Sequence, residues 1–333
     1  MSALDRKKIQ RPDFGRPHVV ILGAGASLAA FPGGDKNGRR LPLMNNIVEV
    51  LGLGPLLDAA GVRAHHGDFE KLYSNLVTGG DHPDVVAEIE RAVFDYFAGL
   101  ELPDEPTLYD HLVLSLREKD TIATFNWDPF LVEAMDRNDN SMPLPQNLFM
   151  HGNVAIGHCM EHTPAALGRR DRNCHRCGRP LKQSRLLFPA HKDYSDPFID
   201  NNWKLLRRAM GRAYVVTVFG YSAPATDAEA VDSLIRAWGG PTRRKLEEFE
   251  IIDIKGEDEL YRVWKQFIHS HHYCTSTSFY KSIIGSSPRR SCEAMWRQLM
   301  EARFIESNPI PQNASWAELM AWCQLLLEDE EQT

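Results

Sequence analysis

The stretch His18-Val-Val-Ile-Leu-Gly-Ala-Gly-Ala-Ser27 decides the fold that we predict for this chain. Its apolar first half is typical of a strand buried on both faces of a parallel sheet. Gly23 and Gly25 then allow a tight turn and the close approach of a ligand, and Ser27 is expected to cap a helix that begins at Leu28. Free N–H groups at such a helix end favour a phosphate, above all a pyrophosphate. The alternative is a tight turn without a ligand, because the third glycine of the dinucleotide fingerprint is missing.

Composition excludes several classes of protein. The 333 residues are long enough for one large domain or two, with 43% hydrophobic and 25% charged residues as in ordinary globular proteins. A net charge of −7 argues against nucleic acid as the main ligand. We expect no membrane segment, since no apolar run has transmembrane length and the N-terminus lacks a signal-peptide core. The six cysteines form no disulfide framework, so a cytoplasmic location is expected.

The spacing of apolar residues after the first strand predicts the architecture. Apolar residues first recur at helical intervals, which predicts a helical insertion over about residues 43–118. Further buried strands are then expected over 121–125, 147–150, 213–219 and 249–254, the last of the series. Strands that alternate with helices predict an α/β fold with a Rossmann-type, doubly wound parallel sheet.

Three units follow from this pattern. We expect a loosely held arm over 1–17 and a nucleotide-binding domain over 18–256. A C-terminal extension of helices and loops is expected over 257–333.

Polar residues follow each predicted strand, where ligands bind in open parallel sheets. Besides the first turn these are Asn126-Trp-Asp128, His151-Gly152, Gly220-Tyr-Ser222 and Asp253. Taken alone, Asn126 or Asp128 is explained by capping a helix, and His151 by a structural hydrogen bond. Their occurrence at successive strand ends predicts a nucleotide crevice.

A second group of residues has the spacing of a metal site. Cys159-Met-Glu-His162 and Cys174-His-Arg-Cys177 form two short knuckles within a module of about 158–180. Two such pairs complete a tetrahedron around zinc, and four protein ligands leave no open position, so the site is expected to be structural. His158 and His175 are alternatives to His162 as the fourth ligand. Thiols that cluster by chance, or a redox Cys-x-x-Cys, are the other interpretations.

The order of these motifs resembles that of the sirtuin family over about residues 18–255. The resemblance includes Thr-Phe-Asn-Trp-Asp128, the strand end Val-Phe-Gly-Tyr-Ser222 and the element Gly220-Tyr-Ser-Ala-Pro-Ala-Thr-Asp227 after Leu187-Phe-Pro. It is greatest with a divergent bacterial branch whose members often act as NAD glycohydrolases in anti-phage defence.

The resemblance implies a role for each strand end. The pyrophosphate of NAD, the substrate, would lie against Gly23, Ala24, Gly25 and Ser27, with Gly220 and Ser222 flanking the phosphates. Asn126 and Asp128 would face the nicotinamide ribose and orient water. His151 would act as general base or bond to a ribose hydroxyl, and Asp253 would reach the adenosine ribose. These residue types suit the oxocarbenium-like cleavage of the nicotinamide–ribose bond.

Two departures favour water as the acceptor. Protein-deacylating sirtuins carry Gly-x-Pro-Asp-Phe-Arg after the first helix and a Phe-Gly-Glu segment after the zinc module. This chain has Phe31-Pro-Gly-Gly-Asp-Lys-Asn-Gly38 and Phe188-Pro-Ala-His-Lys192 there. The alternatives are an NAD-dependent protein deacylase, an ADP-ribosyltransferase, and a non-catalytic NAD or ADP-ribose sensor that regulates a partner. An enzyme that drains NAD must be silent until triggered, so a homo-oligomer or a partner protein of the same defence system is expected.

Overall fold

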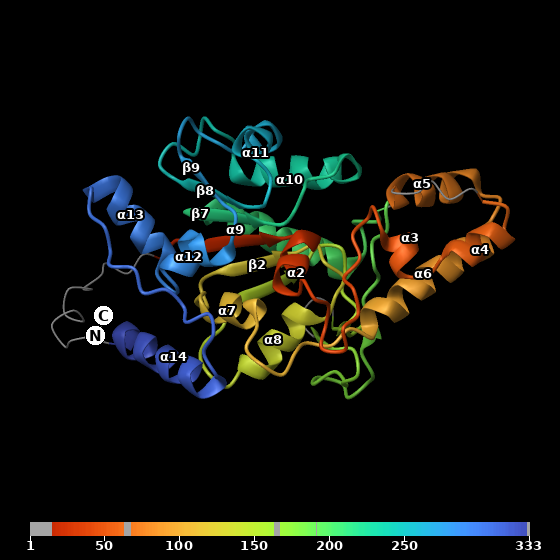
Figure 1. Cartoon of the computed structure of the whole chain (residues 1–333), viewed down its shortest axis with the longest axis horizontal. Coiled ribbons are helices and arrows are strands. Elements are labelled where there is room, and N and C mark those ends of the chain that lie inside the picture. Colours follow the sequence, from red (N-terminus) through yellow and green to blue (C-terminus); the bar gives the residue numbers. More distant parts are fainter. Residues whose placement is uncertain (1–14, 63–67, 163–166, 191, 332–333) are drawn as a thin grey trace.

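The computed structural model describes residues 15–62, 68–162, 167–190 and 192–331, and Figure 1 shows their arrangement. The strands are β1 (His18–Leu22), β2 (Thr121–Thr124), β3 (Gln146–Phe149), β4 (Ile156–His158), β5 (Leu167–Arg169), β6 (Lys182–Gln183), β7 (Val215–Phe219), β8 (Glu248–Ile252) and β9 (Tyr273–Ser276). Six of them form a parallel sheet in the order β3-β2-β1-β7-β8-β9. A small antiparallel sheet has the order β5-β4-β6.

The helices precede, connect and follow these strands. They are α2 (Ala24–Ala30), α3 (Ile47–Val50), α4 (Gly54–Ala59), α5 (Phe69–Gly79), α6 (Pro83–Ala98), α7 (Leu108–Leu114), α8 (Phe130–Asn138), α9 (Pro197–Arg212), α10 (Ala228–Trp238), α11 (Glu257–Trp264), α12 (Ile283–Ser286), α13 (Ser291–Glu301) and α14 (Trp316–Glu331), with short 3-10 turns η2 (Ala225–Asp227) and η3 (Phe279–Lys281). Helices α3 to α7 lie between β1 and β2, and α3 to α6 extend away from the sheet (Figure 1).

Strand β1 lies at the centre of the sheet because it is apolar on both faces. Val19 and Ile21 pack into the layer that contains α9, α10 and α11, whereas Val20 and Leu22 pack into the layer that contains α7 and α8. All four side chains are completely buried. A strand covered on both faces has no polar alternation, and this is why it is a continuous apolar run in the sequence.

The strand order defines the fold class. Counted along the chain, the six strands of the large sheet have the order 3-2-1-4-5-6 of the dinucleotide-binding Rossmann arrangement. The predicted α/β class, with a helical insertion and a small metal-binding module, is therefore confirmed. No helix of the described residues is both long and apolar enough to cross a membrane.

One prediction about the sheet was wrong. Strand β9 lies in the segment that we expected to be helices and loops, and it pairs in parallel with β8, Ile252 opposite Ser276. It is a short edge strand, and each of its four side chains is only half-buried, so it lacks the apolar run of the inner strands. The sheet thus extends beyond residue 256. The division into units 1–17, 18–256 and 257–333 stays a prediction, and residues 1–14 lie outside the described part.

Candidate active site and metal centre

The predicted site residues lie along one edge of the large sheet. Gly23, His151, Gly220 and Asp253 follow the ends of β1, β3, β7 and β8 closely, and Asn126 comes two residues after β2. Because all these strands are parallel, their carboxyl ends share this edge. Connections leave β1 and β7 toward opposite sides of the sheet, and ligands of open α/β sheets bind at such a point.

The glycines of the first turn make room for neighbouring backbone. The amide of Gly25 donates to the carbonyl of Gly220 at 2.9 Å. A Cβ on Gly25 would lie 2.8 Å from the Gly220 Cα, too close for any side chain. Gly220 has a φ of +62°, and a Cβ there would collide with the Ala26 amide. The missing Cβ at Gly25 thus admits the backbone that follows β7, and the predicted role of this turn in binding a ligand stays a prediction.

Ser27 does not cap a helix, which corrects a second expectation. Helix α2 begins at Ala24, directly after Gly23, so Ser27 lies inside it. Its Oγ donates to Oδ2 of Asp128 at 2.7 Å and lies 2.7 Å from the hydroxyl of Tyr109. The amides of Gly25 and Ala26 are already bonded to backbone oxygens. No hydrogen bond in the described part of the chain engages the amide of Ala24, and it remains available to a phosphate.

Asn126 connects the ends of β1 and β2. Its Nδ2 donates to the carbonyl of Gly23 at 2.9 Å and to Oγ of Ser27 at 3.0 Å. Nothing among the described residues donates to its Oδ1. Asp128 is buried beside it, and burial raises the pKa of this carboxyl to about 6, against the lowering effect of the Ser27 hydrogen bond. Asn126 therefore has an oriented oxygen that is free to accept a hydrogen bond from a ligand.

Tyr109 belongs to this cluster, although no sequence motif indicated it. It comes from α7, a helix that Thr107 begins with a capping box. The ring is buried, and burial together with the Asp128 charge raises the pKa of its hydroxyl. No motif distinguishes this tyrosine, because only tertiary packing brings α7 against Ser27.

His151 lies in a second, adjoining cluster. Its ring contacts the edge of Phe125 with 4.8 Å between centroids, and its Nε2 lies 3.8 Å from Oδ1 of Asp227. Lys192 forms an ion pair with the same Oδ1, and the hydroxyl of Tyr221 donates to Oδ2 at 2.8 Å. Burial, and then the charge of Lys192, lower the pKa of His151 well below its usual value. The imidazole is accordingly neutral at physiological pH.

Sequence reasoning missed the role of Lys192 and Asp227. Both nevertheless end stretches that the sequence had singled out, Phe188-Pro-Ala-His-Lys192 and Gly220-Tyr-Ser-Ala-Pro-Ala-Thr-Asp227. The remaining predicted residues lie at the rim of the site: Ser222 is exposed, and half-buried Asp253 accepts a hydrogen bond from the Lys255 amide at 3.0 Å. Neither contacts the His151 cluster through any hydrogen bond of the described chain.

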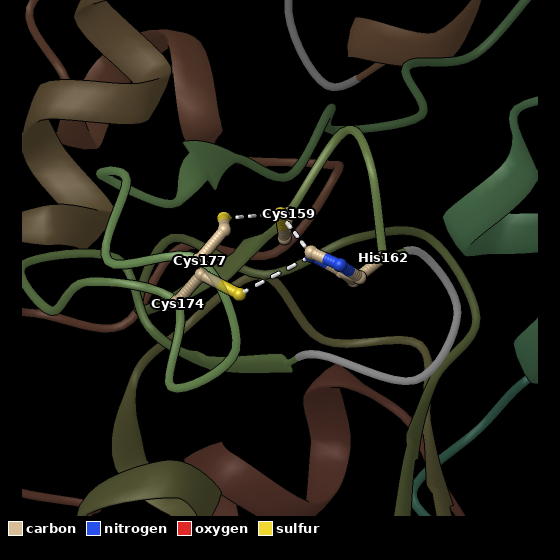
Figure 2. A group of neighbouring side chains, drawn as sticks. All are labelled: Cys159, His162, Cys174 and Cys177. Carbon is tan, nitrogen blue, oxygen red and sulfur yellow. Dashed lines mark hydrogen bonds between the residues drawn. The ribbon is translucent and has the colours of Figure 1, made fainter.

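The predicted metal ligands meet in one group, shown in Figure 2. One ligand atom from each of Cys159, His162, Cys174 and Cys177 lies within 4.8 Å of the other three. Nδ1 of His162 is 3.4 Å from Sγ of Cys159 and 3.7 Å from Sγ of Cys174, and the Sγ atoms of Cys159 and Cys177 are 3.6 Å apart. Zinc bonds of about 2.0–2.3 Å give tetrahedral edges of about 3.5–3.8 Å. The four residues therefore fit a structural zinc ion.

The two alternative ligands lie elsewhere. His158 is in β4 and stacks on Phe198 with 5.5 Å between ring centroids, and His175 is exposed. Residues 163–166 of the predicted module lie outside the described part of the chain. The segment that leads into the module is joined to the loop after β2, since Nδ2 of Asn153 donates to the carbonyl of Asp128 at 2.6 Å.

Comparisons with known proteins return structural likenesses only. No known family profile matches the sequence, and no curated protein is significantly similar to it. The solved structures that it resembles include a Sir2 homologue mutant with ADP-ribose (13% identity, 98% of each chain covered, TM-score 0.42). A Sir2 homologue with NAD has 16% identity, covers 86% of this chain and 90% of its own, and has a TM-score of 0.33. Sir2 bound to an acetylated peptide has 13% identity, 86% and 93% coverage and a TM-score of 0.38. TM-scores this low carry no argument about activity.

Proposed function

We propose that the chain is an NAD⁺ hydrolase, which binds NAD⁺ along the carboxyl edge of the large sheet and cleaves it to nicotinamide and ADP-ribose. The observation that carries this proposal is that Asn126 and His151 follow the carboxyl ends of two neighbouring strands, β2 and β3. Oδ1 of Asn126 and the ring nitrogens of His151 form no hydrogen bond with any described residue, and both side chains lie next to the β1–β7 crossover of a Rossmann sheet. Five motifs in sirtuin order support the choice of NAD⁺ among dinucleotides.

In the proposed reaction the bond between C1′ of the ribose and N1 of nicotinamide breaks, and its electron pair leaves with nicotinamide. Water attacks the positively charged ribose: its oxygen bonds to C1′, and its proton is released to the solvent. Oδ1 of Asn126 orients that water. Neutral His151 accepts a hydrogen bond from a ribose hydroxyl, which strengthens as charge develops on the ring.

The pyrophosphate is proposed to lie at the amide of Ala24, between the Gly23–Gly25 turn and Gly220. Ser222 and Asp253 at the rim then hold the phosphates and the adenosine ribose. A zinc ion held by Cys159, His162, Cys174 and Cys177 would have no open position, so its contribution would be to hold the module that follows Asn153, whose side chain is hydrogen-bonded to the Asp128 carbonyl.

Isotope labelling tests the reaction. Purified protein is incubated with NAD⁺ in ¹⁸O-labelled water at several protein concentrations, with and without an acetylated lysine peptide, and the products are separated by chromatography. We expect equal amounts of nicotinamide and singly labelled ADP-ribose without peptide. Release of nicotinamide only with the peptide would instead identify a deacylase, and ADP-ribose attached to protein an ADP-ribosyltransferase. Tight binding without turnover at any concentration would favour a sensor.

We further propose that the enzyme depletes NAD⁺ as an effector of anti-phage defence, held inactive until a partner or an assembly of its own copies triggers it. The resemblance of the motifs supports this role. The test is the NAD⁺ content of bacteria that carry the chain, followed through phage infection, with an Asn126→Ala strain as the control. An equal NAD⁺ content in both strains throughout infection contradicts the role in defence.

A further inference from the structure

Three buried groups converge on His151 from segments far apart in the sequence. Asp227 ends the turn η2, Lys192 precedes α9, and Tyr221 follows β7. Their side chains share one carboxylate: Lys192 pairs with Oδ1 of Asp227, and Tyr221 donates to Oδ2. The side chains of Lys192 and Asp227 are only 10% and 5% exposed. A salt bridge this deeply buried has a large desolvation cost. We therefore looked for a role that this ion pair serves beside His151.

The surroundings make the carboxylate of Asp227 an acceptor. The ammonium of Lys192 forms an ion pair with it, and the Tyr221 hydroxyl donates to one of its oxygens. The other oxygen, Oδ1, lies 3.8 Å from Nε2 of His151, slightly longer than a hydrogen bond. Catalytic hydrogen bonds often shorten to full strength only when substrate binds. Nε2 is buried and has no other partner in the described part of the chain.

The other charged and titratable groups near this cluster do not replace Asp227. Glu70 of α5 acts on Lys192 from its far side and accepts a hydrogen bond from Thr226 at 2.8 Å. Tyr194 lies 6.3 Å from the His151 ring between centroids, and burial raises the pKa of its hydroxyl. Asp227 is thus the group placed to accept a hydrogen bond from Nε2–H.

We propose that Asp227 is a positioning residue, whose Oδ1 accepts the Nε2–H bond of neutral His151 and leaves Nδ1 as the bare nitrogen that accepts from substrate. Lys192 and Tyr221 keep Asp227 ionised and oriented for this task. A carboxylate that selects one imidazole tautomer is a general device of enzymes that use histidine as a base. The role assigned to Nδ1 rests on the proposed function, whereas the tautomer itself does not.

Nitrogen NMR of histidine-labelled protein tests the tautomer without any turnover. The two ring nitrogens of a neutral imidazole differ widely in ¹⁵N shift according to which one carries the proton, and a His151→Gln variant assigns the signals. At pH 7.5 we expect His151 to be neutral and protonated at Nε2. A proton at Nδ1, or on both nitrogens, overturns the proposal.

Two variants then assign the cause. The double variant Lys192→Met/Asp227→Leu removes both charges together, so that no unpaired charge is left buried, and it should lose the preference for one tautomer. Lys192→Arg keeps a positive charge beside Asp227, and therefore the acceptor, and should keep the tautomer. Asp193→Asn, an exposed carboxylate on the same segment, is the matched control and should leave the His151 signals unchanged. An unchanged tautomer in the folded double variant overturns the proposal.

Kinetics separate this proposal from the hydrolase itself. If the chain hydrolyses NAD⁺, the double variant should lower kcat by about 10²-fold or more, with a much smaller change in the Kd for ADP-ribose. A wild type that shows the Nε2–H tautomer but never releases nicotinamide contradicts the hydrolase and leaves the Asp227–His151 relation standing. A hydrolase with unchanged kcat in the double variant overturns the positioning role alone.

Discussion

Gly25 and Gly220 touch backbone to backbone: the amide of Gly25 donates to the carbonyl of Gly220 at 2.9 Å, and neither residue has room for a Cβ. This contact joins the turn after β1 to the turn after β7, the two turns between which we propose that the pyrophosphate binds. The proposed site therefore depends on two glycines that are 195 positions apart in the sequence, 220 minus 25.

Gly25→Ala should destabilise the fold, because its Cβ must displace the backbone of Gly220. Overpacking of this kind typically costs about 1–3 kcal/mol of unfolding free energy. Denaturant unfolding followed by circular dichroism measures it. Gly33→Ala is the control, since a Cβ there meets no atom within 4 Å and should leave the midpoint unchanged. Equal midpoints for the two variants would mean that the turns do not pack as described.

His162→Ala should abolish zinc binding, whereas His175→Ala should not. Elemental analysis of protein purified without added metal is expected to give about one zinc per chain for the wild type and His175→Ala. Cys174→Ser should lose zinc and lower the Tm together, because metal affinity contributes to folding. Cys274→Ser, outside the cluster, controls for loss of a thiol. A well-folded wild type without zinc contradicts the assignment.

Asn126→Ala and His151→Ala should bind NAD⁺ yet release little nicotinamide, since each residue acts mainly in the transition state. A loss of about 10²–10⁴-fold in kcat is typical of such groups. The double variant should be no worse than the poorer single one if the two act as a unit. The assay needs conditions in which the wild type is active, with ADP-ribose binding measured in parallel. Wild-type rates in both single variants would show that the site lies elsewhere.

Glu250 should make stability fall as the pH rises. It is fully buried, accepts hydrogen bonds from Thr217 at 2.8 Å and from the Ile283 amide at 2.7 Å, and burial raises its pKa from 4.5 to about 7. Between these values the folded state binds more protons than the unfolded chain, so the free energy of unfolding decreases from about pH 4.5 to about 7. Glu250→Gln should flatten this decrease, and Glu49→Gln, on an exposed residue, should not. The same slope in both variants argues against Glu250 as the source.

Lys192→Met should move the acid limb of the activity profile to higher pH. The charge of Lys192, after burial, lowers the pKa of His151, so its removal raises that pKa. Protonated, inactive His151 then persists to higher pH, and kcat/KM falls earlier on acidification. Lys204→Met, on the exposed surface of α9, is the control. An acid limb that stays in place would mean that another group sets it.

The fold was predictable because its inner strands are buried on both faces. β1 and β7 are continuous apolar runs, and a run of that kind has few interpretations. The metal ligands were predictable for a similar reason: Cys159 and His162, like Cys174 and Cys177, are paired in the local sequence. β9 was missed because it is short and half-buried.

The support around the site was not predictable, since tertiary packing creates it. Tyr109 reaches Ser27 from a helix of the insertion, and Lys192 meets Asp227 across 35 positions, 227 minus 192. Nothing in the local sequence of either residue indicates its partner. Ser27 was predicted wrongly because serine is a residue type favoured at helix ends. Here it lies inside a helix, and its hydroxyl links the segments that follow β1 and β2 by a hydrogen bond to Asp128.

The central pair of strands also has a consequence for how the chain is made. His18 of β1 lies opposite Val215 of β7. The strand synthesised first therefore cannot pair with this neighbour until a much later part of the chain has been made. β1 and β7 cannot pair on a ribosome-bound chain until residue 219 has emerged, and pairing over such a distance along the chain slows folding. A nascent chain shorter than this has β1 and β2 but not the turn after β7, so the proposed NAD⁺ site cannot be complete until most of the protein has been made.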